Sequence, residues 1–451
     1  MNLYTMLQAR AERGMPLRVG LIGAGKFGAM FLSQALHTPG LHVLAIADLN
    51  VARTHEQLAS VGWPTEQYRA TSAAKALATG ATYITDDAEE VINAGGIEVI
   101  IEATGVPEAG IRHALKCFER GRHVVMVNVE ADALAGPLLA RRAAAANVVY
   151  SMAYGDQPAL IAEQVDWARA CGFQVISAGK GTKYLPEYHA SSPDTVWDHY
   201  GLSAAEAAAA GMNAKMFNSF LDGTKSAIEM AAVANACGLT PPDDGLLFPP
   251  CGIDDLAQVL RPKTDGGVLA QKGTVEVISS LHRDGSAVER DLRWGVFVSF
   301  EAPSDYVRDC FRQYGVSTDD SGRYSALYRP FHLIGLELGV SVIAAGITGQ
   351  ATGVAKDFRA DVVATAKRGL EAGEVLDGEG GYTVYGSLTG AATSCRNGYL
   401  PIGLASGVTL KTHIANGQPI KFSDVEIDET TLAFQFRREM EAAFNPAGSL
   451  I

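Results

Sequence analysis

The sequence predicts an α/β protein: a Rossmann-type doubly wound parallel sheet, then an α+β catalytic domain and a small β-rich C-terminal domain. The first observation is an apolar run, Leu17 to Ile22, that leads into the glycine pattern Gly23, Gly25 and Gly28. The second is a regular alternation of apolar runs and helical segments up to about Tyr154, which is typical of parallel sheets with right-handed crossovers. The third is a glycine-rich pattern of short apolar runs beyond residue 353.

The length of 451 residues suits two or three domains, because one domain usually has about 100–200 residues. We predict a nucleotide-binding domain over residues 1–155. A catalytic and substrate domain should follow over 156–350, with a helix that returns to the first domain. The β-rich domain should occupy 351–451.

Composition excludes several classes of partner. The formal net charge of −13 argues against nucleic acid and anionic membrane surfaces. The six cysteines are dispersed without a C-x-x-C pair, which favours free thiols in a reducing compartment. The N-terminal segment lacks the apolar core of a signal peptide, and no apolar stretch approaches the ~18 residues of a membrane span. We therefore expect a cytoplasmic protein with no membrane partner.

The glycine pattern G-x-G-x-x-G, between a predicted strand and a helix over residues 29–36, is the dinucleotide fingerprint. The first glycine permits the tight turn, the second lets the backbone approach a pyrophosphate, and the third lets the helix pack on the strand. First-turn N–H groups of the helix would face the phosphates. The cofactor-binding candidates here are Gly23, Gly25, Lys26, Phe27 and Gly28.

Cofactor choice depends on the end of the second predicted strand, His42 to Ala47. It is followed by Asp48, whose carboxylate should bond a ribose 2′-hydroxyl and favour NAD over NADP. Arg53 and Lys26 are the cations that could reach a 2′-phosphate.

Two further strands should end beside the nicotinamide, because ligands of parallel sheets bind at the carboxyl ends of strands. The strand over residues 98–103 leads to Thr104 and Gly105, which are cofactor-binding candidates. The strand over 123–127 leads to Asn128 and Glu130, which are substrate-binding candidates. The long insertion over 54–87 could shape an entry loop or be only surface decoration, and the second interpretation is favoured.

The second domain begins with a helix over residues 159–170 and a strand over 173–178. Lys180 and Lys183 then lie in a predicted glycine-rich turn. A cation there could stabilise negative charge on a reducible carbonyl oxygen and grip a phosphorylated substrate. The alternative is two solvated surface lysines.

One helix is predicted over residues 212–236. It carries Asp222, Lys225 and Glu229 at spacing i, i+3, i+7, so the three should share one face as a proton relay. An ordinary row of surface ion pairs is the alternative. Near residue 330 an apolar helix should begin, where Arg329 could clamp a phosphate and His332 could act as acid or base.

A divalent cation, Mg²⁺ or Mn²⁺, is a further possibility. Asp156 is the metal-ligand candidate, although a hard cation needs more oxygen ligands and the sequence offers only Glu130 and Asp222.

Three motifs carry a family resemblance: the GAGKFG turn, Gly181-Thr182-Lys183, and Asp222-Gly223-Thr224-Lys225. Together they resemble the homoserine-dehydrogenase-like superfamily. Two C-terminal phrases, around Ala372-Gly373 and Asn416-Gly417, look like an SAF domain of the β-clip type. The combination is similar to the 1-deoxy-D-xylulose 5-phosphate reductoisomerase-like family.

The resemblance implies NADPH-dependent conversion of 1-deoxy-D-xylulose 5-phosphate to 2-C-methyl-D-erythritol 4-phosphate, an entry to isoprenoid precursors, with NADH as the other possible cofactor. Two alternatives stay open. One is another NAD(P)-dependent homoserine-dehydrogenase-like oxidoreductase that acts on a small hydroxy or sugar acid. The other is a nucleotide-binding assembly or sensor protein. A homodimer is the expected oligomer.

Overall fold

The computed structural model describes residues 2–444, which divide into two compact units. Within these residues, the first unit comprises 2–160 and 333–356, and the second comprises 161–332 and 357–444. Helix α8 (Gln157–Ala170) carries the chain from the first unit into the second. The three-domain division expected from the sequence stays a prediction.

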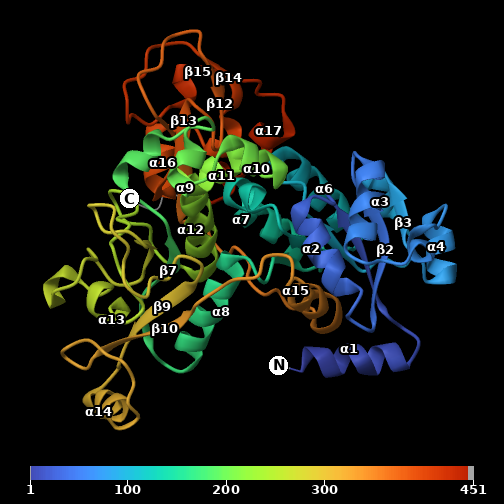
Figure 1. Cartoon of the computed structure of the whole chain (residues 1–451), viewed down its shortest axis with the longest axis horizontal. Helices are drawn as coiled ribbons and strands as arrows, with labels where there is room; N and C mark the ends of the chain where they lie inside the picture. The colour runs from blue at the N-terminus through green and yellow to red at the C-terminus, as the bar shows by residue number, and fades with distance from the viewer. Residues whose placement is uncertain (1, 445–451) are drawn as a thin grey trace. The chain divides into compact units, whose positions relative to one another are not determined.

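The first unit contains a six-stranded parallel sheet in the order β3-β2-β1-β4-β5-β6. Figure 1 labels two of its strands, β2 and β3, in the blue part of the chain. The order reverses between β1 and β4, so the carboxyl ends of these two strands flank the crevice where such sheets bind ligands. The predicted Rossmann-type sheet is confirmed. The strands are β1 (Leu17–Ile22), β2 (Leu41–Ala47), β3 (Tyr83–Thr85), β4 (Val99–Glu102), β5 (His123–Met126) and β6 (Tyr150–Met152).

The segment over residues 54–87 is part of the sheet, so its interpretation as surface decoration is wrong. Its last residues form strand β3, which pairs in parallel with β2. The buried Thr82 hydroxyl also donates a hydrogen bond to the Val43 carbonyl oxygen, 2.7 Å away. A strand of only three residues gives too short an apolar pattern to be recognised in the sequence.

The helices of the first unit follow the predicted alternation, although α2 begins at Lys26, three residues before the predicted start at residue 29. Helix α7 begins at Val129 because Asn128 accepts a hydrogen bond from the Ala131 N–H and caps it, so Pro137 lies inside the helix. The helices are α1 (Leu3–Glu12), α2 (Lys26–Ala35), α3 (Val51–Ser60), α4 (Ala73–Thr79), α5 (Ala88–Asn93), α6 (Pro107–Glu119), α7 (Val129–Ala145) and α15 (Gly339–Ile343). Within residues 2–444, no helix combines the length and apolar character needed to cross a bilayer.

A returning segment completes the core of the first unit. Leu338 and Val342 pack in one buried cluster with Leu7, Leu17 and Val99. Helix α15 of this segment starts later than the sequence suggests, because residues 324–329 form a strand and the next residues form a loop. The prediction of a helix that begins near residue 330 is therefore wrong, since α15 begins at Gly339.

A four-stranded mixed sheet organises the second unit in the order β10-β9-β7-β8. Strand β7 pairs in parallel with β8 and antiparallel with β9. It extends to Thr182, so Lys180 lies in a central strand and not in the predicted turn. The strands are β7 (Gln174–Thr182), β8 (Thr274–Ser279), β9 (Val296–Glu301) and β10 (Tyr324–Arg329).

The long helix predicted over residues 212–236 is two helices. Gly223 separates them with φ of +90°, a left-handed conformation that favours glycine. Asp222 therefore ends one helix and does not share a face with Lys225 and Glu229. The helices of this region are α9 (Val196–Tyr200), α10 (Ala204–Ala209), α11 (Ala214–Leu221), α12 (Thr224–Cys237), α13 (Leu256–Val259) and α14 (Asp305–Gln313).

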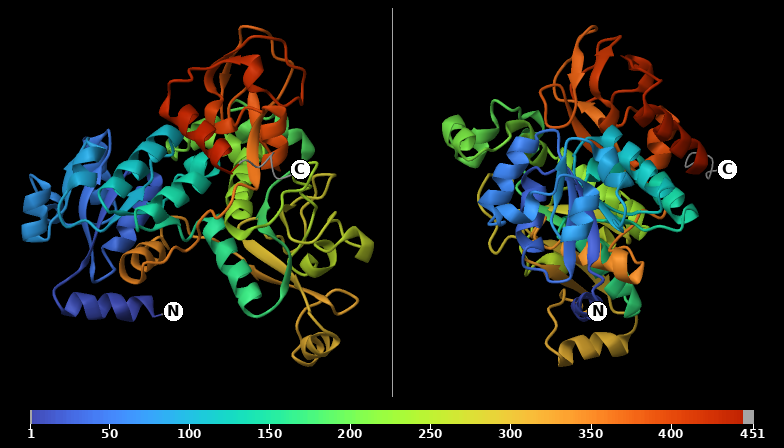
Figure 2. Two further views of the ribbon diagram at one scale, coloured as in Figure 1. Left: turned by 180° about the vertical axis from the view of Figure 1, so that it is seen from behind. Right: turned by 90° about the vertical axis from the view of Figure 1, so that its right-hand side faces the viewer.

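The C-terminal part of the second unit is β-rich, as predicted. Its two similar phrases pair with each other, because Leu370 and Ile414 exchange backbone hydrogen bonds of 2.9 Å. Strands β11 and β13 pack on α12, which Figure 2 shows beneath the orange and red C-terminal strands. The elements are β11 (Ala360–Ala366), β12 (Val375–Asp377), β13 (Val384–Gly390), α16 (Ala391–Asn397), β14 (Ser406–Leu410), β15 (Val425–Glu426) and α17 (Leu432–Phe444).

A buried ion pair fastens the last helix. The fully buried Arg437 guanidinium donates to both carboxylate oxygens of Asp361 at 3.0 and 2.6 Å, and its Nε donates to Glu441 at 2.9 Å. Bidentate geometry of this kind satisfies both charges away from water.

We expect Arg437→Ala to lower the free energy of unfolding of the second unit by about 3–5 kcal/mol, because Asp361 would keep a buried, unpaired charge. Arg438→Ala is the matched control. That side chain is half exposed and pairs with Glu441, so its loss should cost under about 1 kcal/mol. Denaturant unfolding measures both, and equal losses would contradict the assignment.

Candidate functional site

The glycine turn of the first unit has the geometry of a dinucleotide cradle. Gly23 has φ of +95°, and a Cβ there would lie 2.6 Å from the Ala103 carbonyl oxygen. A Cβ on Gly28 would lie 2.7 Å from the Gly23 carbonyl oxygen. A Cβ on Gly25, in contrast, would meet nothing within 4 Å. Two glycines are thus required by packing, and the third leaves open space in front of the helix.

The start of α2 offers unfilled hydrogen-bond donors. Gly25 is its N-cap residue and no side chain caps the helix, so its first-turn N–H groups can face an anion. Asp48 borders this turn: its carboxylate accepts from the N–H of Ala24 at 2.8 Å and of Asn50 at 2.9 Å. Lys26 is exposed in the first turn of α2, and the half-exposed Arg53 guanidinium lies 3.5 Å from the Asp48 carboxylate.

The candidates at the ends of β4 and β5 are partly engaged in structural contacts. The Thr104 hydroxyl donates to the buried Glu102 carboxylate at 2.6 Å, and the exposed Gly105 follows with φ of +68°. The Asn128 amide donates to the Val106 carbonyl at 2.9 Å and caps α7. Glu130 lies in the first turn of α7.

In the second unit, Lys180 and Glu229 form a buried ion pair. Lys180 extends from β7 and its ammonium donates to the Glu229 carboxylate on α12. The two side chains are 7% and 4% exposed. Lys225, one helical turn before Glu229, is half-buried. A desolvated ammonium held by a carboxylate can supply a proton or stabilise an oxyanion.

Lys183 follows β7 and lies beside a second cation. Its ammonium donates to the His199 carbonyl oxygen and lies 5.7 Å from the centre of the Tyr200 ring. The Arg293 guanidinium is also 5.7 Å from that ring. Burial and the charge of Arg293 lower the pKa of Lys183. Neither cation has a carboxylate partner among the described residues, so the pair is a candidate site for an anion.

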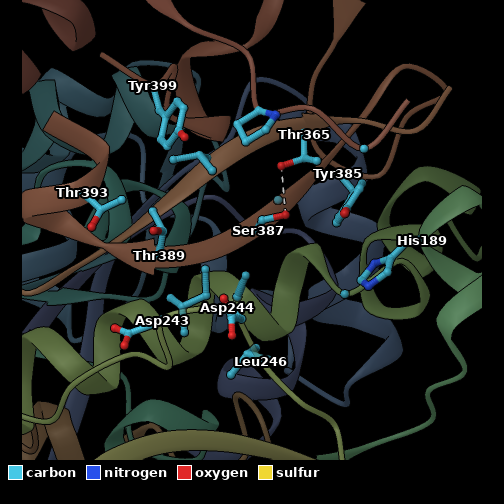
Figure 3. Close-up of a pocket in the computed structure, with 18 of the residues that line it drawn as sticks. His189, Asp243, Asp244, Leu246, Thr365, Tyr385, Ser387, Thr389, Thr393 and Tyr399 are labelled. Atoms are coloured by element: carbon cyan, nitrogen blue, oxygen red, sulfur yellow. Dashed lines mark hydrogen bonds between the residues drawn. The ribbon is translucent and has the colours of Figure 1, made fainter. Parts of the chain in front are cut away.

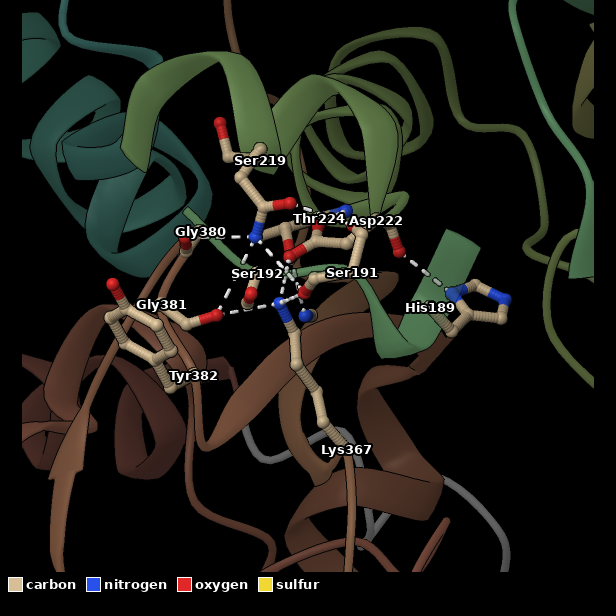
Figure 4. Close-up of polar contacts among 12 residues, drawn as sticks. His189, Ser191, Ser192, Ser219, Asp222, Thr224, Lys367, Gly380, Gly381 and Tyr382 are labelled. Carbon is tan, nitrogen blue, oxygen red and sulfur yellow. Dashed lines mark hydrogen bonds and ion pairs between the residues drawn. The ribbon is translucent and has the colours of Figure 1, made fainter. Parts of the chain in front are cut away.

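Asp222 is fully buried and faces the C-terminal part of its unit (Figure 4). Its carboxylate lies 2.7 Å from the Lys367 ammonium, which also donates to the carbonyl oxygens of Ser191 and Gly381 at 2.7 Å. The adjacent Asn218 donates to the Gly380 carbonyl at 2.9 Å. These contacts indicate that Asp222 positions the C-terminal strands, and its catalytic role stays a prediction.

The remaining candidates lie apart from these clusters. Arg329 ends the edge strand β10, with its guanidinium 5.1 Å from the Phe331 ring. His332 lies in the following loop and donates through Nδ1 to the Trp294 carbonyl at 2.7 Å. The buried Asp156 carboxylate accepts from the Gln157 N–H at the start of α8. No group of three or more His, Cys, Asp or Glu side chains suited to a metal occurs within residues 2–444.

Glu276 on β8 anchors a loop that no sequence pattern indicated. Its Oε1 accepts from the backbone N–H groups of Leu247 at 3.0 Å, Phe248 at 3.4 Å and Val277 at 2.8 Å. Burial raises the pKa of the Glu276 carboxyl from 4.5 to about 7. The residue thus fixes the segment that precedes β8 and titrates near neutral pH.

Comparison with protein families identifies two regions of the chain. Residues 155–338 match the model of the family described as oxidoreductase DRL, catalytic domain. Residues 361–426 match the SAF domain. The chain therefore contains a region similar to an oxidoreductase catalytic domain, followed by an SAF domain. No curated protein matches the chain.

Similar solved structures include dehydrogenases of low sequence identity. A homoserine dehydrogenase from Thiobacillus denitrificans is 14% identical over 80% of this chain and 83% of its own, with a TM-score of 0.43. A probable dehydrogenase from Thermotoga maritima is 13% identical over 75% and 91%, with a TM-score of 0.39. A myo-inositol dehydrogenase from Lactobacillus casei is 15% identical over 40% and 50%, with a TM-score of 0.28. This chain spans half of the latter, and similarity at this level assigns no activity.

These findings correct the family resemblance. The matching catalytic family is oxidoreductase DRL, so the assignment to the 1-deoxy-D-xylulose 5-phosphate reductoisomerase-like family is wrong. The isoprenoid function implied by that resemblance loses its support. The SAF domain is confirmed.

Two residues of these clusters were missed in the sequence. Lys367 stands in an ordinary Lys-Arg-Gly turn, far along the chain from Asp222. Arg293 precedes Trp294 in a predicted loop, and only the fold brings it to the side of Lys183. Neither residue stands in a motif, so the sequence carried no signal for them.

We expect Glu276→Gln to change the pH dependence of stability. Because the pKa of Glu276 is raised, the folded protein keeps a proton on this carboxyl between about pH 4.5 and 7, whereas the unfolded chain has lost it. The free energy of unfolding of the wild-type protein therefore falls as the pH rises through that range. The fall should amount to roughly 3 kcal/mol and disappear in the variant. The variant should therefore match the wild type at pH 5 and exceed it at pH 8.

Denaturant titrations at these two pH values test this expectation. Glu289→Gln is the matched control, because Glu289 is exposed and should give a curve parallel to the wild type. Parallel curves for Glu276→Gln as well would refute the role of the buried carboxyl.

Proposed function

We propose that this protein is an NAD(P)-dependent oxidoreductase that acts on a small hydroxy or sugar acid, or on a related anionic polyol. The observation that carries the proposal is the glycine cradle at the start of α2, where Gly23 and Gly28 admit no side chain and Gly25 opens toward free N–H groups. The match of residues 155–338 to an oxidoreductase catalytic domain supports it.

The residues of the cradle fit a dinucleotide. The start of α2 would hold the pyrophosphate, and Asp48 would accept a hydrogen bond from the ribose 2′-hydroxyl. A bound nicotinamide supplies the hydride acceptor or donor. The expectation of NADPH rested on the corrected resemblance, whereas the Asp48 carboxylate disfavours a 2′-phosphate. We therefore assign NAD(H) as the preferred cofactor.

The second unit would hold the substrate. Lys183 and Arg293 would bind its carboxylate or phosphate, since two neighbouring cations without a carboxylate partner favour an anion. Lys180, held by Glu229, would donate a proton to the carbonyl oxygen during reduction and take it back during oxidation. We also keep two expectations from the sequence as proposals. One is that a divalent cation takes part, and the other is that the substrate is a phosphorylated sugar.

We expect the wild-type protein to bind NADH at least tenfold more tightly than NADPH, a difference of about 1.4 kcal/mol. Asp48→Asn should reduce this discrimination, because it removes the negative charge and keeps an acceptor for the Ala24 N–H. Fluorescence titration with the two nucleotides measures both constants. Tighter binding of NADPH by the wild type would overturn the assignment.

In a panel of polyols, we expect turnover of members with a carboxylate or phosphate and none of their neutral analogues. Lys183→Met and Arg293→Met should each raise KM by at least tenfold with a smaller change in kcat, because they remove binding common to the ground and transition states. Arg290→Met is the control, since its exposed side chain pairs with Asp254. Initial rates of nicotinamide absorbance change measure these effects, and turnover of neutral analogues would contradict the anion site.

A further inference from the structure

A cavity lies in the second unit between its catalytic region and the SAF domain (Figure 3). Its volume is about 360 Å³, which is within the range of small-molecule sites. One wall is the face of β11 and β13 that carries Thr365, Tyr385, Ser387 and Thr389. The opposite wall is the loop over residues 243–248.

Several polar groups in the cavity have no protein partner. Asp243 and Asp244 are exposed to solvent, and their carboxylates make no hydrogen bond or ion pair with any residue from 2 to 444. The hydroxyl groups of Thr389, Thr393 and Tyr399 likewise donate to no described residue. Such groups on facing walls are an array of acceptors and donors for a ligand.

An aromatic wall closes one end. The His189 ring stacks on Tyr385, with centroids 4.4 Å apart and an interplanar angle of 25°. Nδ1 of His189 donates to the Asp222 carbonyl oxygen at 2.7 Å, so its Nε2 accepts from the Tyr184 hydroxyl at 2.9 Å. Burial lowers the pKa of His189, which favours this neutral ring. Its orientation is therefore fixed, and it offers a flat face rather than a charge.

The charge of the cavity selects the class of ligand. Two aspartates and no lysine or arginine line it, which disfavours the anions that suit the Lys183 and Arg293 site and favours a cation. The lining hydroxyl groups and aromatic rings suit a hydroxylated molecule with an apolar face, because such rings attract both cations and C–H surfaces.

We propose that this cavity is a second ligand site, which binds a hydroxylated primary amine of monosaccharide size. The ammonium group contacts Asp243 and Asp244, and the hydroxyl groups bond to Thr389, Thr393 and Tyr399. The site is independent of hydride transfer, because it uses none of the residues assigned to nucleotide or substrate.

Calorimetric titration of the full chain without nucleotide tests the proposal. The probes are D-glucosamine and D-galactosamine, their neutral counterparts D-glucose and D-galactose, and the anion D-gluconate. We expect the amines to bind at least tenfold more tightly than the neutral sugars, with no binding of gluconate. The amines should also raise the midpoint of thermal unfolding in proportion to their occupancy.

The variants assign the binding to this cavity. Asp243→Asn with Asp244→Asn should weaken amine binding at least tenfold, and Thr389→Val should weaken the binding of every ligand that binds. Asp166→Asn is the control, because it removes an exposed carboxylate of α8 outside the cavity. Unchanged unfolding midpoints without ligand show that the variants fold. No amine binding, equal binding of neutral sugars, or amine binding that survives the Asp243 and Asp244 changes would each overturn the proposal.

Discussion

The ion pair of Lys367 and Asp222 is the interaction on which the second unit depends. The Lys367 ammonium lies 2.7 Å from an Asp222 carboxylate oxygen and donates hydrogen bonds to the carbonyl oxygens of Ser191 and Gly381. It thereby joins the break between α11 and α12, the loop before α9 and a turn of the SAF domain. Burial of two charges is costly unless they are paired and further hydrogen-bonded, and here the ammonium is paired with the carboxylate and bonds to both carbonyl oxygens. The same junction fixes His189 through the Asp222 carbonyl oxygen.

Features that depend on neighbouring residues could be predicted from the sequence. The glycine turn, the strand that ends at Asp48 and the alternation of strands and helices all follow from local pattern, and the structure confirms them. Features that depend on tertiary contact could not be predicted from the sequence. The stretch over residues 212–236 has a continuous helical pattern, yet the pairing of Asp222 with Lys367 accompanies a break at Gly223. The partnership of Lys183 with Arg293 is likewise created only by the fold.

The extension of β7 changes the character of the proposed substrate site. Lys180 lies in a central strand with hydrogen-bonded neighbours on both sides, and Lys183 follows directly after it. A side chain on such a strand is held more accurately than one on a glycine-rich turn, because backbone pairing fixes its direction. The pairing with Glu229 fixes the far end as well. The geometry is thus set before any substrate arrives.

Helix α12 belongs to a hydrophobic core that the two matched regions share. All of its residues from Ser226 to Cys237 are buried, since β7 and β8 cover it on one side and β11 and β13 on another. The region matched to the oxidoreductase family ends at residue 338 and the SAF match begins at 361, yet the core of one includes strands of the other. The boundary between the two matched regions is therefore not a boundary between two independent hydrophobic cores. A gene fragment that ends between residues 338 and 361 would encode α12 with β7 and β8 but without β11 and β13, which cover its other side.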